Sequence, residues 1–209
     1  MGRLIVIEGL DGAGKRTLSD KLVAAFADHG ASVVVHAFPR YGRSVTADLV
    51  RDGLYGRLGG LGDEVYGMGV LYALDRLGAR DDLLADLGAH DVVLLDRYVA
   101  SNAAYGAARL HEDAHGAFVE WVRAIEIERF GLPVPTAQVL LRVAPEVAAE
   151  RTQGRESTEA QTRDTWEVDG GLQARCAAVY DQLAAEHWLS PWHAVDGADA
   201  VALAAALLG

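Results

Sequence analysis

Short apolar runs alternate along the chain with longer segments in which apolar residues recur every three or four positions. The strand-like runs are Leu4–Ile7, Ser32–Phe38, Val92–Leu95, Ala137–Val143 and a segment near Trp192–Val195. Between them, positions such as Leu18, Leu22 and Phe26 follow the spacing of an amphipathic helix. This alternation favours an α/β fold with an open, mainly parallel sheet of about five strands and helices on both faces.

The first strand leads directly into a glycine-rich segment, residues 9–17, which reads Gly-Leu-Asp-Gly-Ala-Gly-Lys-Arg-Thr. Glycines allow successive backbone N–H groups to converge on an anion at the start of a helix. Lys15 adds a mobile positive charge for phosphates. The strand before and the helix after disfavour an ordinary glycine-rich turn, so the segment predicts a P-loop NTPase-type fold. The predicted donor-phosphate residues are Gly9, Asp11, Gly12, Ala13, Gly14, Lys15, Arg16 and Thr17.

One position departs from the strict phosphate-loop pattern. The residue after the lysine is normally Ser or Thr, whose hydroxyl binds Mg²⁺. Here Arg16 occupies that position and Thr17 follows it. Arg16 is either a cation that stabilises charge on the transferred group, with Thr17 contacting the phosphates or metal, or a solvated arginine in the first helical turn.

Composition narrows the classes of function. The chain has 209 residues, which suits one domain spanning residues 1–209. Its net charge of −11 disfavours general nucleic-acid binding, which needs a basic surface, but leaves small phosphorylated ligands possible. A single cysteine, Cys176, fits a structural role in a reducing compartment. No apolar run approaches the roughly 20 residues that span a bilayer, so we expect a soluble, cytoplasmic protein without a membrane partner.

Polar residues also stand at the ends of the second and third strands. Asp96 and Arg97 end the third, at the edge where open α/β sheets bind ligands. Asp96 could hold Mg²⁺ and Arg97 could grip a phosphate, or the two could form a structural salt bridge. Residues 38–42, Phe-Pro-Arg-Tyr-Gly, offer donors to an anion or form a plain exposed turn.

Two further residues lie four apart on a predicted helix. Tyr72 and Arg76 therefore share one helix face. They could sandwich and hydrogen-bond a nucleotide base, or make an aromatic–arginine contact on the surface. Residues 154–162 are polar and lack periodicity, as expected of a surface segment, and a lid would lie there in a phosphotransferase.

These segments together resemble the bacterial thymidylate kinases. The similarity rests on the phosphate loop from Glu8, the turn at residues 38–42, Leu74-Asp75-Arg76, and the sequence from Asp96 to Tyr105, and it runs to about residue 187. It implies transfer of the γ-phosphoryl of ATP to dTMP, giving dTDP and ADP in dTTP synthesis for DNA replication. It also implies Mg²⁺ as cofactor and a homodimer. The helices around Val65–Leu77 and Ala103–Leu110 suit either a dimer contact or internal packing.

The resemblance implies roles in binding the acceptor nucleotide. Tyr72 matches an aromatic, more often phenylalanine, that stacks on thymine, while Arg76 and Asn102 match residues that read the base edge. Tyr105 matches a tyrosine that disfavours a 2′-hydroxyl. The remaining implied acceptor residues are Asp11, Phe38, Pro39, Arg40, Tyr41, Arg97, Ser101 and Trp166, the last standing where tyrosine is usual. Gly106 stands where many members have glutamine.

Further roles concern the donor, the metal and the lid, which is expected at about residues 151–163. Arg151 is implied to bind ATP, and Arg155 best matches a catalytic arginine of the lid. The predicted catalytic set, with Arg16 included from its position in the phosphate loop, is Asp11, Lys15, Arg16, Arg97 and Arg155. The implied metal ligands are Asp11, Asp96 and Glu167.

A monophosphate acceptor is largely a dianion at neutral pH, because its second pKa is about 6. The nucleophile is then already deprotonated, and catalysis reduces to alignment and charge neutralisation. A deoxynucleoside kinase is the alternative enzyme, and its hydroxyl acceptor would need a base such as Glu8 or Asp96. A broader pyrimidine monophosphate kinase also stays open. A GTPase-like switch is disfavoured because no Asn-Lys-x-Asp segment occurs.

Overall fold

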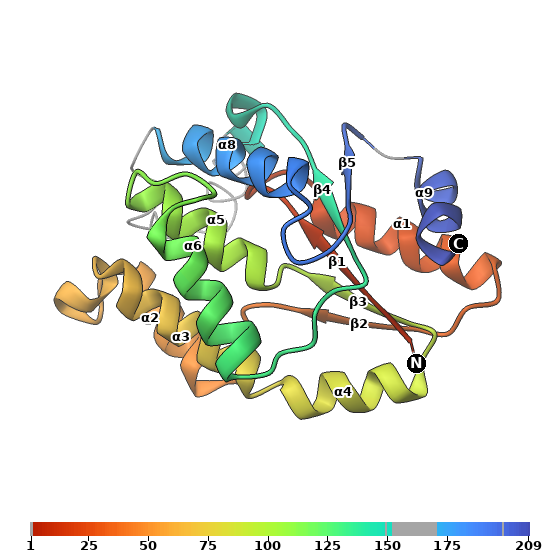
Figure 1. Ribbon diagram of the computed structural model, residues 1–209, viewed down its shortest axis with the longest axis horizontal. Helices are drawn as coiled ribbons and strands as arrows, with labels where there is room; N and C mark the ends of the chain where they lie inside the picture. The colour runs from red at the N-terminus through yellow and green to blue at the C-terminus, as the bar shows by residue number, and fades with distance from the viewer. Residues whose placement is uncertain (1, 149, 152–170, 198) are drawn as a thin grey trace.

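A five-stranded parallel sheet forms the centre of the protein. The computed structural model describes residues 2–148, 150–151, 171–197 and 199–209. The strands are β1 (Arg3–Glu8), β2 (Val33–Ala37), β3 (Val92–Asp96), β4 (Ala137–Leu141) and β5 (Trp192–Val195), in the order β2-β3-β1-β4-β5. Each neighbouring pair is parallel (Figure 1). The expected fold class is confirmed, with strand ends shifted from those predicted by no more than two residues.

Helices cover both faces of this sheet (Figure 1). They are α1 (Lys15–Asp28), α2 (Val45–Leu54), η1 (Gly59–Gly62), α3 (Val65–Leu77), α4 (Arg80–Ala89), α5 (Val99–Arg109), α6 (Ala117–Val122), η2 (Arg123–Arg129), α8 (Leu172–Ala185) and α9 (Ala200–Leu208). Residues 145–148 and 150–151 are also helical. No helix within the described ranges is long and apolar enough to cross a membrane.

Side chains of β1 alternate between two apolar cores. Ile5 and Ile7 pack with Phe26 of α1 and Leu203 of α9 on one face. The intervening side chains, such as Val6, belong to the core that α4, α5 and α8 cover on the other face. All of β1 from Leu4 onward is buried, as expected for a central strand of a parallel sheet.

The helix that starts as α6 changes its winding at residue 123. Residues Arg123–Arg129 form a π-helix, in which the Phe130 N–H donates to the Ile125 carbonyl five residues earlier. This wider turn brings Glu126 into the interior, where its side chain is fully buried. π-Helical turns are rare and often occur at functional sites.

Small residues of α3 and α5 serve packing inside the subunit. A Cβ on Gly106 would lie 2.0 Å from Cε1 of Phe118, and a Cβ on Gly69 would lie 3.0 Å from Trp121. The sequence left open whether these helices form a dimer contact or pack inside the subunit, and internal packing is confirmed for these two glycines. The Phe118 ring also accounts for the absence of a side chain at position 106, where the resemblance suggested glutamine.

Candidate active site

The phosphate loop connects β1 to α1. Gly9 has φ 142°, and a Cβ there would lie 2.6 Å from the Leu141 carbonyl oxygen, so this position requires glycine. Gly14 has φ 96° and precedes the first turn of α1. The loop therefore directs its backbone N–H groups toward the helix start, the arrangement that binds phosphates.

Lys15 folds back over the loop. Its Nζ donates to the carbonyl oxygens of Gly9, at 3.2 Å, and Leu10, at 2.9 Å. Burial, together with the positive charge of Arg97, lowers the pKa of Lys15 to about 8, although nearby carboxylates oppose the change. Burial makes the charged form of Lys15 less stable than it would be in water, and the negative charge of a bound polyphosphate would stabilise that form.

Arg97 and Asp11 form an ion pair across the site. Arg97 Nη2 donates to Asp11 Oδ1 at 2.5 Å, and the Tyr105 hydroxyl donates to Asp11 Oδ2 at 2.8 Å. The Arg97 guanidinium also lies 5.2 Å from the centre of the Tyr105 ring. Burial acts to raise the pKa of Asp11, but Arg97 and Lys15 outweigh it and hold that pKa well below its usual range. Asp11 is therefore ionised at neutral pH.

Local structure aims Arg97 into this cluster. Arg97 has φ 68°, an unusual value for a residue with a side chain, and it lies two residues before the start of α5. Ser101 and Tyr105 lie four apart on α5 and therefore share one helix face, which Arg97 contacts from the preceding segment. Arg97 Nη1 donates to Ser101 Oγ at 3.0 Å.

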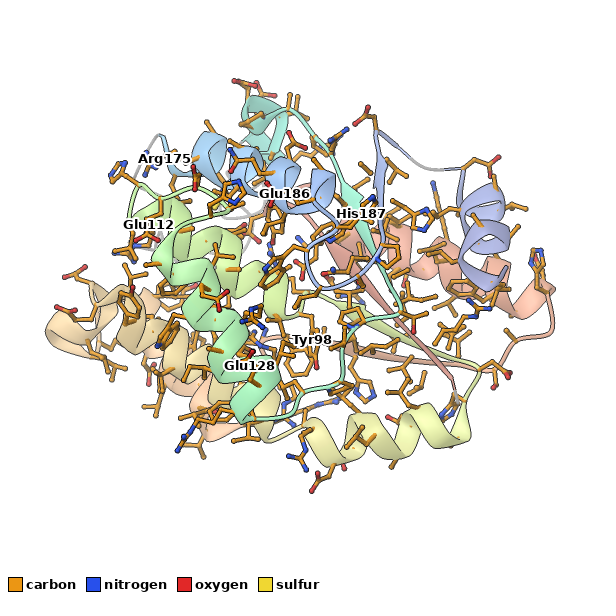
Figure 2. The ribbon with its side chains drawn as sticks, in the orientation of Figure 1. Tyr98, Glu112, Glu128, Arg175, Glu186 and His187 are labelled. Carbon is orange, nitrogen blue, oxygen red and sulfur yellow. The ribbon has the colours of Figure 1, made fainter. Side chains whose placement is uncertain are left out.

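Glu8 supports the same region from inside. Its Oε1 accepts from the Tyr98 N–H at 2.9 Å, and its Oε2 accepts from Ser101 Oγ at 2.6 Å and from the Tyr180 hydroxyl at 2.9 Å. Figure 2 shows Tyr98 in the interior, beside the chain that follows η2, where its hydroxyl donates to the Pro133 carbonyl. Burial raises the pKa of Glu8, although these donors and Arg97 oppose the change. Glu8 is thus a structural acceptor, a role that its position before the phosphate loop did not reveal.

A cavity of about 560 Å³ opens beside the phosphate loop. It brings together residues from α2, α3, α5 and the turn after β2, which are far apart in the sequence. The acceptor-site residues that were predicted and line it are Asp11, Phe38, Pro39, Tyr41, Tyr72, Arg76, Arg97, Ser101, Asn102 and Tyr105. Leu54, Val65, Gly69, Gly106, Phe118, Leu172 and Gln173 complete the described lining.

Arg40 is a predicted acceptor residue whose side chain pairs with Asp75. Its Nε donates to Asp75 Oδ1 at 2.9 Å, and its Nη2 donates to the Asp75 carbonyl at 2.7 Å. The Arg40 backbone N–H also donates to Asp75 Oδ2 at 2.9 Å. Arg40 is outside the described cavity lining and connects the turn after β2 to α3.

The end of the cavity formed by α3 and α5 carries a buried polar cluster. Arg76 donates to Glu126 from Nε at 2.5 Å and from Nη2 at 2.7 Å. Asn102 Nδ2 donates to Glu126 Oε1 at 2.8 Å and to the Gly69 carbonyl at 3.1 Å. Sequence reasoning identified Arg76 and Asn102 but missed Glu126.

A second cavity, of about 570 Å³, also borders the phosphate loop. Gly9, Leu10, Ala13 and Arg151 line it. Arg142 after β4, and Asp196 and Gly197 after β5, were not predicted. The signal for these residues was their position at the carboxyl ends of strands, the edge at which parallel sheets bind ligands.

Comparison with known proteins decides the family. A family model described as thymidylate kinase matches residues 7–190. The thymidylate kinase of Mycobacterium tuberculosis is 53% identical over 197 residues, which cover 94% of this chain and 92% of that protein. That of Akkermansia muciniphila is 36% identical, covering 95% and 85%, and that of Caenorhabditis elegans is 30% identical, covering 87% and 78%.

The chain belongs to the thymidylate kinase family. Membership of the family makes it a phosphotransferase and disfavours the GTPase-like switch. The structure adds that the two carboxylates considered as bases for a nucleoside kinase, Glu8 and Asp96, are absent from the described lining of both cavities.

The remaining predicted residues of this thymidylate kinase fall into three groups. Arg16 and Thr17 are exposed in the first turn of α1, and Arg16 makes no ion pair with any residue in the described ranges. Asp96 has one buried oxygen, Oδ1, without a hydrogen-bond partner among the described residues. Arg155, Trp166 and Glu167 lie outside the described residues, as does most of the expected lid.

Proposed function

We propose that this thymidylate kinase transfers the γ-phosphoryl of ATP to dTMP, giving dTDP and ADP for dTTP synthesis. The observation that carries the proposal is that two cavities border one phosphate loop. A kinase that joins two nucleotides needs one cavity for each, with the loop between donor and acceptor phosphates. The relatives named thymidylate kinase support dTMP as the acceptor.

The acceptor nucleotide is assigned to the cavity lined by Tyr72 and Arg97. Tyr72 would stack on the thymine ring, with Arg76 and Asn102 at its polar edge. Arg97 would bind the acceptor phosphate near Asp11, and Tyr105 would lie at the sugar. Arg40 would act on this site through the turn that it anchors to Asp75.

ATP is assigned to the second cavity. Its phosphates would bind the backbone of the phosphate loop and Lys15. Its adenosine would lie between residues that follow β4 and β5, with Arg142, Asp196 and Gly197 as contacts. Arg142 is already oriented by a 2.7 Å bond from its Nε to Asp181.

The reaction needs no carboxylate base in this arrangement. A dTMP phosphate with a second pKa of about 6 arrives largely as a dianion. The protein's task is to align it with the donor and to neutralise the charges that repel each other. Lys15 and Arg97 supply charge from the described residues, and we assign the same role to Arg16 and Arg155.

Mg²⁺ is proposed as the cofactor. Asp96 offers the better protein ligand, because its Oδ1 is buried without a partner, whereas both oxygens of Asp11 already accept hydrogen bonds. Mg²⁺ is commonly held by one or two carboxylates together with phosphates and water. When bound, Mg²⁺ would neutralise charge on the donor phosphates. Glu167 remains a proposed ligand.

The assembly and location are further proposals. A homodimer is expected of the family, and the internal packing of Gly69 and Gly106 leaves its interface to other residues. A reducing cytoplasm suits Cys176, a buried thiol whose Sγ lies 3.8 Å from the Ala104 carbonyl oxygen.

A panel of acceptors tests the substrate assignment. ATP is supplied with dTMP, dUMP, dCMP, dAMP or dGMP, and ADP is measured with and without a chelator of divalent cations. We expect dTMP to give the highest kcat/KM and the chelator to abolish turnover. A purine monophosphate as the best acceptor would contradict the assignment, and full turnover with the chelator would contradict the role of Mg²⁺.

A further inference from the structure

Glu126 contacts both side chains that are assigned to the base edge. It accepts two hydrogen bonds from Arg76, at 2.5 and 2.7 Å, and one from Asn102, at 2.8 Å. Arg76 and Asn102 line the acceptor cavity, whereas Glu126 is fully buried and outside its described lining. Any effect of Glu126 on the acceptor must therefore act through these two neighbours.

This carboxylate determines which way the Asn102 amide faces. Carbonyl and carboxylate oxygens accept hydrogen bonds but donate none. The two groups at Asn102 Nδ2 are the Gly69 carbonyl and the Glu126 carboxylate, so only the amide nitrogen can satisfy that side. None of the described residues donates to Asn102 Oδ1. The oxygen is thus the part of the amide left to accept a hydrogen bond from a ligand.

Arg76 provides the complementary group. Its Nε and one proton of Nη2 are committed to Glu126, which leaves the second Nη2 proton and the two Nη1 protons as donors for the cavity that Arg76 lines. An arginine can only donate. The wall of the cavity therefore combines one acceptor, Asn102 Oδ1, with the donors of Arg76.

We propose that Glu126 is a positioning residue that fixes this donor–acceptor pattern before the acceptor nucleotide binds. The proposal rests on the proposed function and extends it to base selection. Thymine and uracil present a donor at N3 and an acceptor at O4, which complement Asn102 and Arg76. Cytosine presents an acceptor at N3 and a donor at its amino group, so both contacts would be mismatched.

The π-helical turn explains how a glutamate reaches this place. Glu126 lies in the π-helix Arg123–Arg129 and points into the core. Glu128, labelled in Figure 2, lies two residues later on the same helix and is exposed. It pairs with Arg123 Nη1 at 2.7 Å. The two glutamates thus provide a buried test position and an exposed control in one helix.

The test compares Glu126→Gln with Glu128→Gln. A glutamine at 126 places an amide nitrogen where only donors face it, so Arg76 must move or Asn102 must rotate. We expect the preference for dTMP over dCMP, as a ratio of kcat/KM, to fall about tenfold or more, mainly through KM. The inhibition constant of dCMP replaces its kcat/KM where turnover is too slow. Glu128→Gln should leave the ratio unchanged.

The Glu126→Asp variant tests whether a different carboxylate at this position preserves the preference for dTMP over dCMP. An aspartate still only accepts hydrogen bonds, so the ratio should stay within about threefold of the parent even where the overall rate falls. A Glu126→Gln enzyme that loses dTMP and dCMP turnover equally would overturn the proposal. So would a glutamine variant with parental selectivity.

A measurement on the unaltered enzyme covers the case in which the variants do not fold. Proton exchange of the Asn102 side-chain amide is followed by NMR in the nucleotide-free protein. Both amide protons should be protected, because each is bound to a fixed acceptor. Exchange as fast as that of a surface amide would overturn the proposal. Failure of the parent enzyme to phosphorylate dTMP would instead contradict the proposed function.

Discussion

Arg97 donates from Nη2 to Asp11 Oδ1 at 2.5 Å, although the two residues are 86 positions apart in the chain. Arg97 stands at the end of β3, and Asp11 lies within the phosphate loop. The pair therefore connects the acceptor cavity to the donor loop before either nucleotide binds. Tyr105 contacts both partners and limits the ways in which Arg97 can move.

This connection makes Arg97 the arginine whose loss should cost most among the described residues. Arg97→Ala should lower kcat about 10³-fold, since arginines that stabilise phosphoryl transfer contribute roughly 10³ to 10⁵. Arg97→Lys should recover only part of the rate, because lysine lacks the planar fork that binds Ser101 and Asp11 together. Steady-state kinetics measure both variants, with the exposed Arg123→Ala as control. Parental kcat in Arg97→Lys would refute the role of the fork.

Substitution of Arg16 should affect turnover and dTMP binding to different extents. Because it follows Lys15 at the helix start and makes no ion pair within the described ranges, it is available to the transferring phosphoryl group. Arg16→Ala should therefore reduce kcat far more than it weakens dTMP binding, measured by calorimetry. The control is Lys21→Ala, an exposed cation later on α1. Unchanged turnover in Arg16→Ala would mean that Arg16 is a solvated surface residue.

The pH dependence of kcat/KM for ATP should reflect the ionisation of Lys15. With a pKa of about 8, Lys15 loses its positive charge as the pH rises through 8, so kcat/KM for ATP should fall above that pH. At saturating ATP the bound phosphates favour the charged form, and the fall in kcat should move to higher pH. Asp11 contributes nothing here, because its pKa lies below its usual range.

A lysine-to-arginine exchange checks this assignment. The guanidinium introduced by Lys15→Arg would stay charged throughout the alkaline range. The fall in kcat/KM for ATP near pH 8 should then disappear, even if the absolute rate is lower. The same alkaline fall in that variant would assign it to another group.

The fold was predictable because local and global signals agree. The apolar strands alternate with helical periodicity, and the glycines of the loop follow β1 directly, so pattern alone predicted the parallel sheet and the phosphate loop. The resemblance then identified ten described residues that line one cavity. Their convergence depends on α3 and α5 lying side by side, which no local pattern encodes.

Several contacts and residues of the site could not be predicted from the sequence, for physical reasons. Glu126 belongs to no recognisable motif, and its side chain is buried within the π-helix Arg123–Arg129, which the sequence pattern did not predict. Arg40 stays a prediction as an acceptor residue, and its pairing with Asp75, 35 positions away, is a contact that no local pattern shows. Arg142 and Asp196 carry no motif, and their position at the ends of β4 and β5 becomes a signal only once the strand order is known.

Packing at Gly106 gives a prediction about stability. A Cβ there would lie 2.0 Å from the Phe118 ring, so Gly106→Ala should lower the free energy of unfolding by about 1–3 kcal/mol. Gly88, in the exposed part of α4, has open space around it. Gly88→Ala should raise that free energy by about 0.5–1 kcal/mol through helix propensity. Urea denaturation measures both, and equal effects would contradict the packing argument.

The central claim is that the acceptor is a phosphate dianion rather than a hydroxyl. ATP labelled at the γ-phosphorus is incubated with the enzyme and either dTMP or thymidine, and the labelled products are separated. The account predicts label in dTDP with dTMP and no label in dTMP when thymidine is supplied, because the Glu8 carboxylate is committed to Tyr98, Ser101 and Tyr180 and lies outside the described lining of both cavities. Efficient labelling of thymidine, with none in dTDP, would contradict it.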